Sequence, residues 1–85
     1  MNILVSNEFE RHFKKLPKDL KLMAYDKSAI FLVDHFHASL KTHKLKGELE
    51  GYYSFSINNK YRIVFKFEGK DSVRFCRIGT HDIYE

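Results

Sequence analysis

Hydrophobic positions follow two different periods along this chain, and the change of period divides it into a helical part and a strand part. The apolar run at 2–5 favours a short strand, and Ser6 after it is a suitable helix N-cap. Phe9, Phe13 and Leu16 then recur at i, i+4 and i+7, which is the spacing of one helical face. A strand followed by an amphipathic helix is therefore predicted at the N-terminus.

The helical spacing resumes after Pro17, the only proline of the chain. Proline ends the first helix, and its fixed backbone suits the first turn of the next one. Apolar residues continue with helical spacing from Leu20 to about Phe36. Residues 6–36 are therefore predicted to form a helical hairpin.

From Leu45 onward the apolar residues alternate with a period of two. The segments "GYYSFSI", "YRIVFKFE" and "SVRFCRIG" read as strands, separated by turn signals at 58–60 and 68–71. The apolar set assigned to the helix-covered face is Phe55, Ile57, Ile63, Phe65 and Phe67. The set left on the open face is Ser54, Ser56, Arg62, Val64 and Lys66. This pattern predicts an α+β fold: a helical hairpin packed on one face of a mainly antiparallel four-stranded sheet.

Length and composition narrow the class of protein. The 85 residues suit a single domain spanning 1–85, and 44% of them are hydrophobic, enough for a core without staples. The lone Cys76 excludes an internal disulfide and a cysteine-based zinc site. No apolar stretch approaches the roughly 20 residues that cross a bilayer, and the N-terminus lacks a positive leader. We therefore expect a soluble, cytoplasmic protein.

The net charge of +4 is unevenly distributed. Residues 1–47 contain nine Lys or Arg against five Asp or Glu, whereas residues 48–85 contain six of each. Much of the excess lies in the cluster Lys41, Lys44 and Lys46. Such an excess favours a polyanion such as RNA, DNA or an acidic protein. A solvated, lysine-rich helix surface explains the same charge, and both interpretations stay open.

The C-terminal segment offers the clearest acid–base chemistry. Gly79 lets the backbone turn after the last strand, and His81 follows it. His81 shares the parity of Phe75 and Arg77, so we expect it near the face that bears Arg62. An imidazole beside a guanidinium suits RNA cleavage, in which the 2′-hydroxyl attacks its own phosphate without a metal. A structurally idle histidine in a polar tail is the alternative.

Other candidates have weaker patterns. Tyr84 could supply a second proton or a stacking surface, and His43 is either a second acid–base group or a loop histidine. Arg62 is either a cross-strand partner or a phosphate clamp, because its planar fork matches phosphate oxygens. His35 and His37 form an H-x-H at the end of the helical region, without further ligands at useful spacing. We expect neither a metal nor another cofactor.

Three segments carry a family resemblance. They are "LKGELEGY" at 45–52, "YRIVF" at 61–65 and "IGTHD" at 78–82, and the similarity extends over nearly the whole chain. Together they resemble the RelE/ParE superfamily of bacterial type II toxins. The resemblance implies a compact α+β toxin that pairs with an antitoxin. RelE-like members cut mRNA on the ribosome without a metal, whereas ParE-like members inhibit DNA gyrase.

The resemblance also implies roles for single residues. Arg62 matches the strand arginine that RelE-type toxins use at the scissile phosphate. His81 falls where YafQ-like toxins carry a catalytic histidine and RelE an arginine. His43 resembles a histidine that YafQ-like toxins place before the second strand, and Tyr84 resembles a C-terminal aromatic residue near the cut.

The sequence departs from the family pattern in its second predicted strand, "GYYSFSI". Ser54 and Ser56 stand where RelE has lysines, and Ser56 also replaces a histidine of YafQ-like toxins. Lys60 replaces their following aspartate. The constellation is thus a hybrid with one clear arginine and one clear histidine.

These observations lead to one main hypothesis and two alternatives. The main hypothesis is a ribosome-dependent mRNA endoribonuclease whose partners are a cognate antitoxin, the ribosome and mRNA. Its predicted catalytic residues are His81, Arg62, His43 and Tyr84. Its predicted RNA-contacting residues are Lys41, Lys44, Lys46, Lys66 and Arg77. The alternatives are a ParE-like, non-enzymatic inhibitor of gyrase and a degenerate toxin that binds only its antitoxin.

Overall fold

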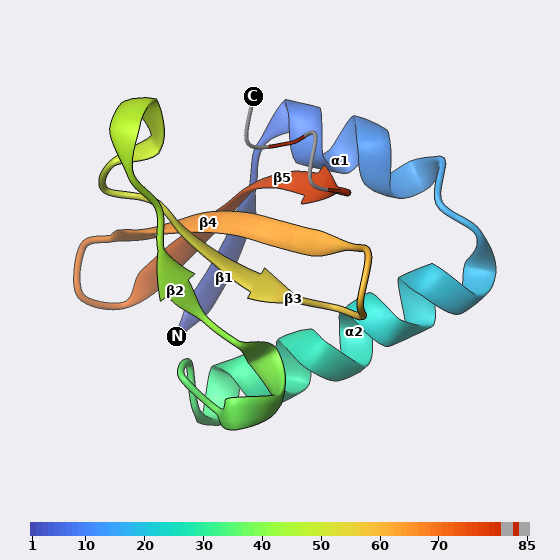
Figure 1. Cartoon of the computed structure of the whole chain (residues 1–85), viewed down its shortest axis with the longest axis horizontal. Helices are drawn as coiled ribbons and strands as arrows, with labels where there is room; N and C mark the ends of the chain where they lie inside the picture. The colour runs from blue at the N-terminus through green and yellow to red at the C-terminus, as the bar shows by residue number, and fades with distance from the viewer. Residues whose placement is uncertain (81–82, 84–85) are drawn as a thin grey trace.

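The computed structural model describes residues 1–80 and 83, which form two helices and one sheet (Figure 1). The strands are β1 (Asn2–Val5), β2 (His43–Lys44), β3 (Tyr53–Ser56), β4 (Arg62–Glu68) and β5 (Ser72–Gly79). The helices are α1 (Asn7–Lys14) and α2 (Lys18–Val33), with short 3₁₀ turns η1 (Ala38–Leu40) and η2 (Gly47–Leu49). The predicted α+β class is confirmed.

The sheet of the described residues has five strands in the order β1-β5-β4-β3-β2. β1 runs parallel to β5, and the other pairs are antiparallel. The prediction of a mainly antiparallel sheet holds, but the predicted strand count of four is one too low. The additional strand, β2, has only two residues, which is too short for an alternating pattern to appear in the sequence.

The helix boundaries follow from local chemistry. The Ser6 hydroxyl accepts a hydrogen bond from the Phe9 N–H at 2.9 Å, so Ser6 caps α1 as predicted. Pro17 occupies the N-cap position of α2. This helix ends at Val33, three residues before the predicted end, because Asp34 adopts an extended backbone with φ −150° and ψ 100°. No described helix is long and apolar enough to span a membrane.

The core is an aromatic cluster between the helices and one face of the sheet. Phe31 of α2 is fully buried. The centre of its ring lies 4.9 Å from the ring centre of Phe55, 4.8 Å from that of Phe65 and 5.8 Å from that of Phe75. Phe9 of α1 contacts Phe75 at 5.7 Å. In Figure 1, α1 lies near the end of β5 and α2 runs below β3.

The predicted strand parity is correct for β4, with one exception in burial. Phe65 is fully buried on the helix side, whereas Arg62 lies on the opposite face and bonds to Ser56. Phe67 was predicted to be in the core but is 37% exposed. It lies near the β4–β5 turn, at the edge of the cluster, where its ring contacts those of Phe65, His35 and Tyr53.

The sheet face opposite the helices is less open than predicted. Ser54 and Val64 lie on this face, as expected, but both are almost completely buried. Leu49 and Tyr52, from the segment between β2 and β3, line a small pocket of about 230 Å³ together with Val64. This segment therefore folds over the middle of the face, which sequence alternation cannot reveal.

A β-bulge changes the parity of β5. Val64 stands opposite Arg77 while Phe65 stands opposite Phe75, so Cys76 is the extra residue. The prediction that Phe75 and Arg77 share one face is therefore wrong. Phe75 packs into the helix-covered core, whereas Arg77 lies on the other face.

Candidate functional site

Arg62 begins β4 directly after a tight turn. The turn is held by the Asn58 side-chain oxygen, which accepts hydrogen bonds from the N–H groups of Lys60 at 2.9 Å and Tyr61 at 2.8 Å. The half-buried Arg62 guanidinium donates to the Ser56 hydroxyl at 3.1 Å. Strand pairing and a side-chain bond thus orient this arginine on the face without helices.

His43 lies on the same face, at the far edge of the sheet. The strand register places His43 in one row across the sheet with Ser54 of β3, Val64 of β4 and Arg77 of β5. Its side chain is exposed, and Nδ1 lies 3.0 Å from the carbonyl oxygen of Lys41. Because a carbonyl only accepts, Nδ1 carries the proton and Nε2 can accept one. β3 lies between His43 and Arg62, so the two residues are two strand spacings, roughly 10 Å, apart across the sheet and two residues, roughly 7 Å, apart along it.

Two of the predicted catalytic residues, His81 and Tyr84, lie outside the described residues. The surrounding positions are described. Gly79 closely approaches Ile83, since a Cβ at Gly79 would lie 2.6 Å from the Ile83 Cγ2 atom. The N–H of Ile83 also donates to the carbonyl oxygen of Thr80 at 3.1 Å. Ile83 therefore lies against the end of β5.

The predicted RNA-contacting lysines separate into two groups. Lys44 and Lys46 line a pocket of about 520 Å³ at the β2–β3 edge, together with Tyr52. Lys41 is exposed nearby, at the end of η1. Lys66 lies on β4, with its amine 5.7 Å from the centre of the Tyr52 ring. Tyr52 thus lies between the two groups of lysines. Its position in the alternating segment did not indicate this role.

Charges near Lys66 are partly neutralised. Its amine lies 3.8 Å from Glu68, and Arg74 forms a two-pronged pair with the same carboxylate at 2.6 and 3.2 Å. The Arg74 hydrogen bond lowers the pKa of Glu68 below its ordinary value and raises the pKa of Arg74. Arg74 was not among the predicted site residues, although its register opposite Lys66 places it on their common face.

Cys76 lies at the bulge, and burial raises the pKa of its thiol. Because the thiolate is the nucleophile, we expect Cys76 in the folded protein to react with iodoacetamide at pH 8 about three- to tenfold more slowly than in the unfolded chain. Mass spectrometry of timed samples, with and without guanidinium chloride, measures the two rates. Equal rates would show that the bulge leaves the thiol accessible and fully reactive.

The two histidines of the H-x-H pattern have local partners. His35 Nδ1 lies 2.6 Å from the Phe31 carbonyl oxygen, and its ring packs against the Phe31 ring. His37 Nδ1 lies 2.9 Å from the Ser39 hydroxyl. Within residues 1–80 and 83, no three His, Cys, Asp or Glu side chains are grouped to hold a metal ion.

Comparison with solved structures identifies the fold. A YoeB/ParE toxin from Agrobacterium tumefaciens superimposes with a TM-score of 0.82 at 18% identity, over 95% of this chain and 99% of that chain. YafQ from E. coli gives 0.76 at 25% identity over 98% and 96%. YafQ in the E. coli DinJ–YafQ toxin–antitoxin complex gives 0.73 at 24% identity over 96% and 93%.

These matches define the class of protein. The chain has the fold of the RelE/ParE toxins, and the resemblance indicated by its sequence motifs is confirmed. No family model matches the sequence, and no curated protein does. The likeness to YafQ, at 25% identity, extends over almost the full length of both chains.

Proposed function

We propose that this protein is the toxin of a type II toxin–antitoxin pair and that residues 1–85 act as one domain that cleaves mRNA on the ribosome. The observation that carries the proposal is the orientation of Arg62. Its guanidinium lies on the face without helices and is supported by Ser56, in a fold shared with YafQ. A half-buried arginine held in this way is suited to bind a phosphate.

The proposed reaction needs no metal. The RNA 2′-hydroxyl attacks the adjacent phosphorus after losing its proton to a base, and the bond to the 5′-oxygen breaks as that oxygen receives a proton. Arg62 stabilises the negative charge that accumulates on the phosphate oxygens. His81 is the proposed acid–base group, His43 is the second one, and Tyr84 stacks on a base or assists the leaving group.

Ser54 and Ser56 have a different role from the lysines that RelE carries at these positions. Both serines are buried, and Ser56 accepts a hydrogen bond from Arg62. The serine at position 56 therefore supports the arginine, whereas a lysine there would add a second charge. Positive charge on this face comes instead from Arg62, Lys66, Arg74 and Arg77.

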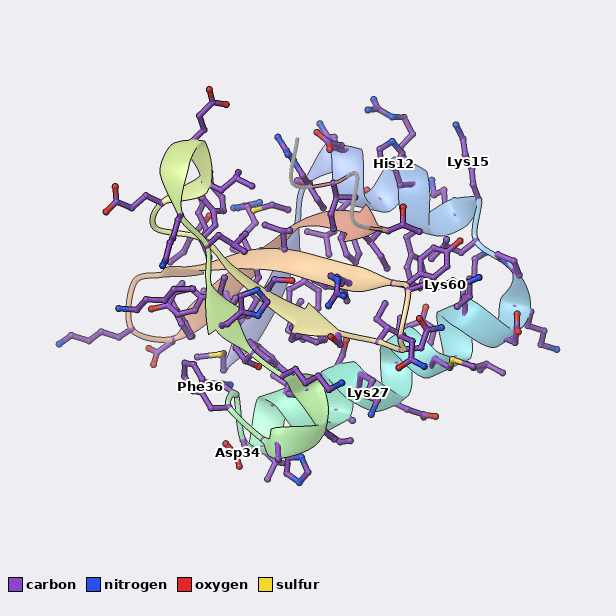
Figure 2. All side chains as sticks on the ribbon, in the orientation of Figure 1. His12, Lys15, Lys27, Asp34, Phe36 and Lys60 are labelled. Carbon is purple, nitrogen blue, oxygen red and sulfur yellow. The ribbon has the colours of Figure 1, made fainter. Side chains whose placement is uncertain are left out.

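An antitoxin is the proposed partner, as DinJ is for YafQ in the solved complex. Helix α2 exposes several large apolar side chains, which in a small protein often mark an interaction surface. They include Leu22 (53% exposed), Tyr25 (63%) and Val33 (90%). Phe36, which follows the end of α2 near Asp34 in Figure 2, is 58% exposed. The positive net charge favours an acidic partner segment that folds as it binds.

The antitoxin prediction is tested with the product of the adjacent gene. We expect a high-affinity complex whose dissociation constant rises roughly tenfold between 50 and 500 mM salt, because screening weakens its electrostatic part. Isothermal titration calorimetry at both salt concentrations measures this. Absence of a complex at either concentration would contradict the toxin–antitoxin assignment.

The second candidate function is ParE-like inhibition of gyrase. The serines at 54 and 56 favour it, because they remove the lysines that RelE carries there. Two assays on the same induced cultures separate the candidates. Primer extension on mRNA detects new 5′ ends if the protein cleaves RNA, and a supercoiling assay detects loss of gyrase activity. New mRNA ends with unchanged supercoiling are the expected result, and the reverse would replace the nuclease by the gyrase inhibitor.

A further inference from the structure

The Cys76 bulge aims Arg77 at the face without helices. Strict alternation from Val73 and Phe75 would direct position 77 into the core, which has no partner for a guanidinium. The extra residue in β5 instead places Arg77 opposite Val64. Bulges commonly redirect a side chain in this way next to functional sites.

The cap of α1 holds the bulge in place. The Ser6 hydroxyl donates to the Cys76 carbonyl oxygen at 2.8 Å, and the Ser6 N–H donates to the Phe75 carbonyl oxygen at 3.0 Å. The same hydroxyl accepts the Phe9 N–H. One serine therefore couples the start of the helix to the direction of Arg77.

Arg77 joins three segments of the chain. Its Nε lies 3.5 Å from a carboxylate oxygen of Glu8, in the first turn of α1. Its Nη1 atom donates to the carbonyl oxygen of Ile83 at 2.8 Å. A guanidinium that already binds a carboxylate and a carbonyl has fewer donors left for an RNA phosphate.

Ile83 is fixed by more than this hydrogen bond. Its side chain packs directly on Gly79, where any Cβ would collide with it at 2.6 Å. Its N–H is bonded to the Thr80 carbonyl oxygen at 3.1 Å. The glycine, the turn and the arginine thus hold the same residue against the end of β5.

We propose that Arg77 is a positioning residue: it anchors the C-terminal tail at Ile83 and thereby supports the catalytic role proposed for His81, instead of contacting RNA. His81 precedes Ile83 by two residues in the sequence. The catalytic consequence rests on the proposed function. The anchor itself rests only on the contacts of Arg77, Glu8, Gly79 and Ile83.

The anchor is tested by amide hydrogen exchange, measured by NMR. In Arg77→Ala, the Ile83 amide should exchange about tenfold faster, because a charge-assisted hydrogen bond to its residue is lost. Gly79→Ala should accelerate the same amide while Arg77 is intact. Arg74→Ala is the control. It removes another cation of β5, one that is paired with Glu68 of β4, and should leave the exchange rate of the Ile83 amide unchanged. An Ile83 exchange rate unaffected by Arg77→Ala would overturn the anchor.

The catalytic consequence is tested by a double-mutant cycle on ribosomal mRNA cleavage. Arg77→Ala should lower kcat about tenfold with KM within twofold, and should cause no further loss in the His81→Ala background. Arg77→Lys should restore part of kcat, since lysine can still reach one of the two partners. Binding to a 2′-deoxy substitute for the cleavage site should be unchanged.

Direct RNA contact predicts a different pattern. The two losses would then add, binding would weaken for Arg77→Ala, and the salt slope of binding would fall by roughly one. That outcome would overturn the positioning role. If the wild-type protein cleaves no mRNA, the proposed function fails, and the exchange rate of Ile83 still decides whether Arg77 anchors the tail.

Discussion

Replacing His81 with alanine is expected to abolish growth arrest and to slow mRNA cleavage by about 10²–10⁴-fold, because a general acid–base group usually contributes that much. This corresponds to about 3–5 kcal/mol of activation free energy. Growth of induced cultures and the rate of cleavage on purified ribosomes measure the effect. The fold and the antitoxin complex are expected to be preserved, which circular dichroism and calorimetry with the antitoxin check.

His12→Ala is the matched control for His81→Ala. His12 lies on α1, outside the sheet that bears Arg62 (Figure 2), and its replacement should leave toxicity intact. Circular dichroism confirms that both variants fold. If His81→Ala cuts mRNA at the wild-type rate, the tail is a structural cap and the catalytic assignment is wrong.

Arg62→Ala should reduce cleavage by about 10²–10³-fold, which is the usual effect of removing a preorganised donor to developing charge. The imidazole of His81 remains in this variant, so the loss isolates phosphate stabilisation. Arg62→Lys should recover only part of the rate, because lysine keeps the charge but not the planar fork. Single-turnover cleavage on programmed ribosomes measures the three rates.

Arg11→Ala is the control for Arg62, since Arg11 is an exposed cation on α1. It should change cleavage by less than about twofold. Thermal unfolding tests whether the loss of the Arg62–Ser56 hydrogen bond destabilises the sheet, and a decrease of about 1 kcal/mol is expected. Full activity of Arg62→Ala would exclude the phosphate role and favour the gyrase inhibitor.

The sequence identifies most of the architecture, because each signal is local. Period 3.6 before Phe36 and period 2 after Leu45 separate helices from strands. Ser6 and Pro17 act within one helical turn, and the structure places both at helix starts. Parity alone assigns Phe65 to the core and Arg62 to the other face, as observed.

The sequence also suggests a family and a set of candidate residues, but not how they meet. Arg62 and His43 are on one face of the sheet, yet β3 separates them. Their distance depends on strand order and register, which are set by contacts between segments far apart in the chain. The sheet face opposite the helices was expected to be open, because nothing in the local sequence indicates that Leu49 and Tyr52 fold over it.

What the sequence by itself determined is the α+β class, the helix starts, the core parity and the family resemblance, because each depends on neighbours within a few positions. Only the tertiary structure decided the fifth strand, the partial burial of the second face and the bulge at Cys76. The bulge is the clearest case. Its extra residue is fixed by Ser6, 70 positions away in the chain, and it reverses the face on which Arg77 lies. Alternation along one strand contains no record of a hydrogen bond made by another segment.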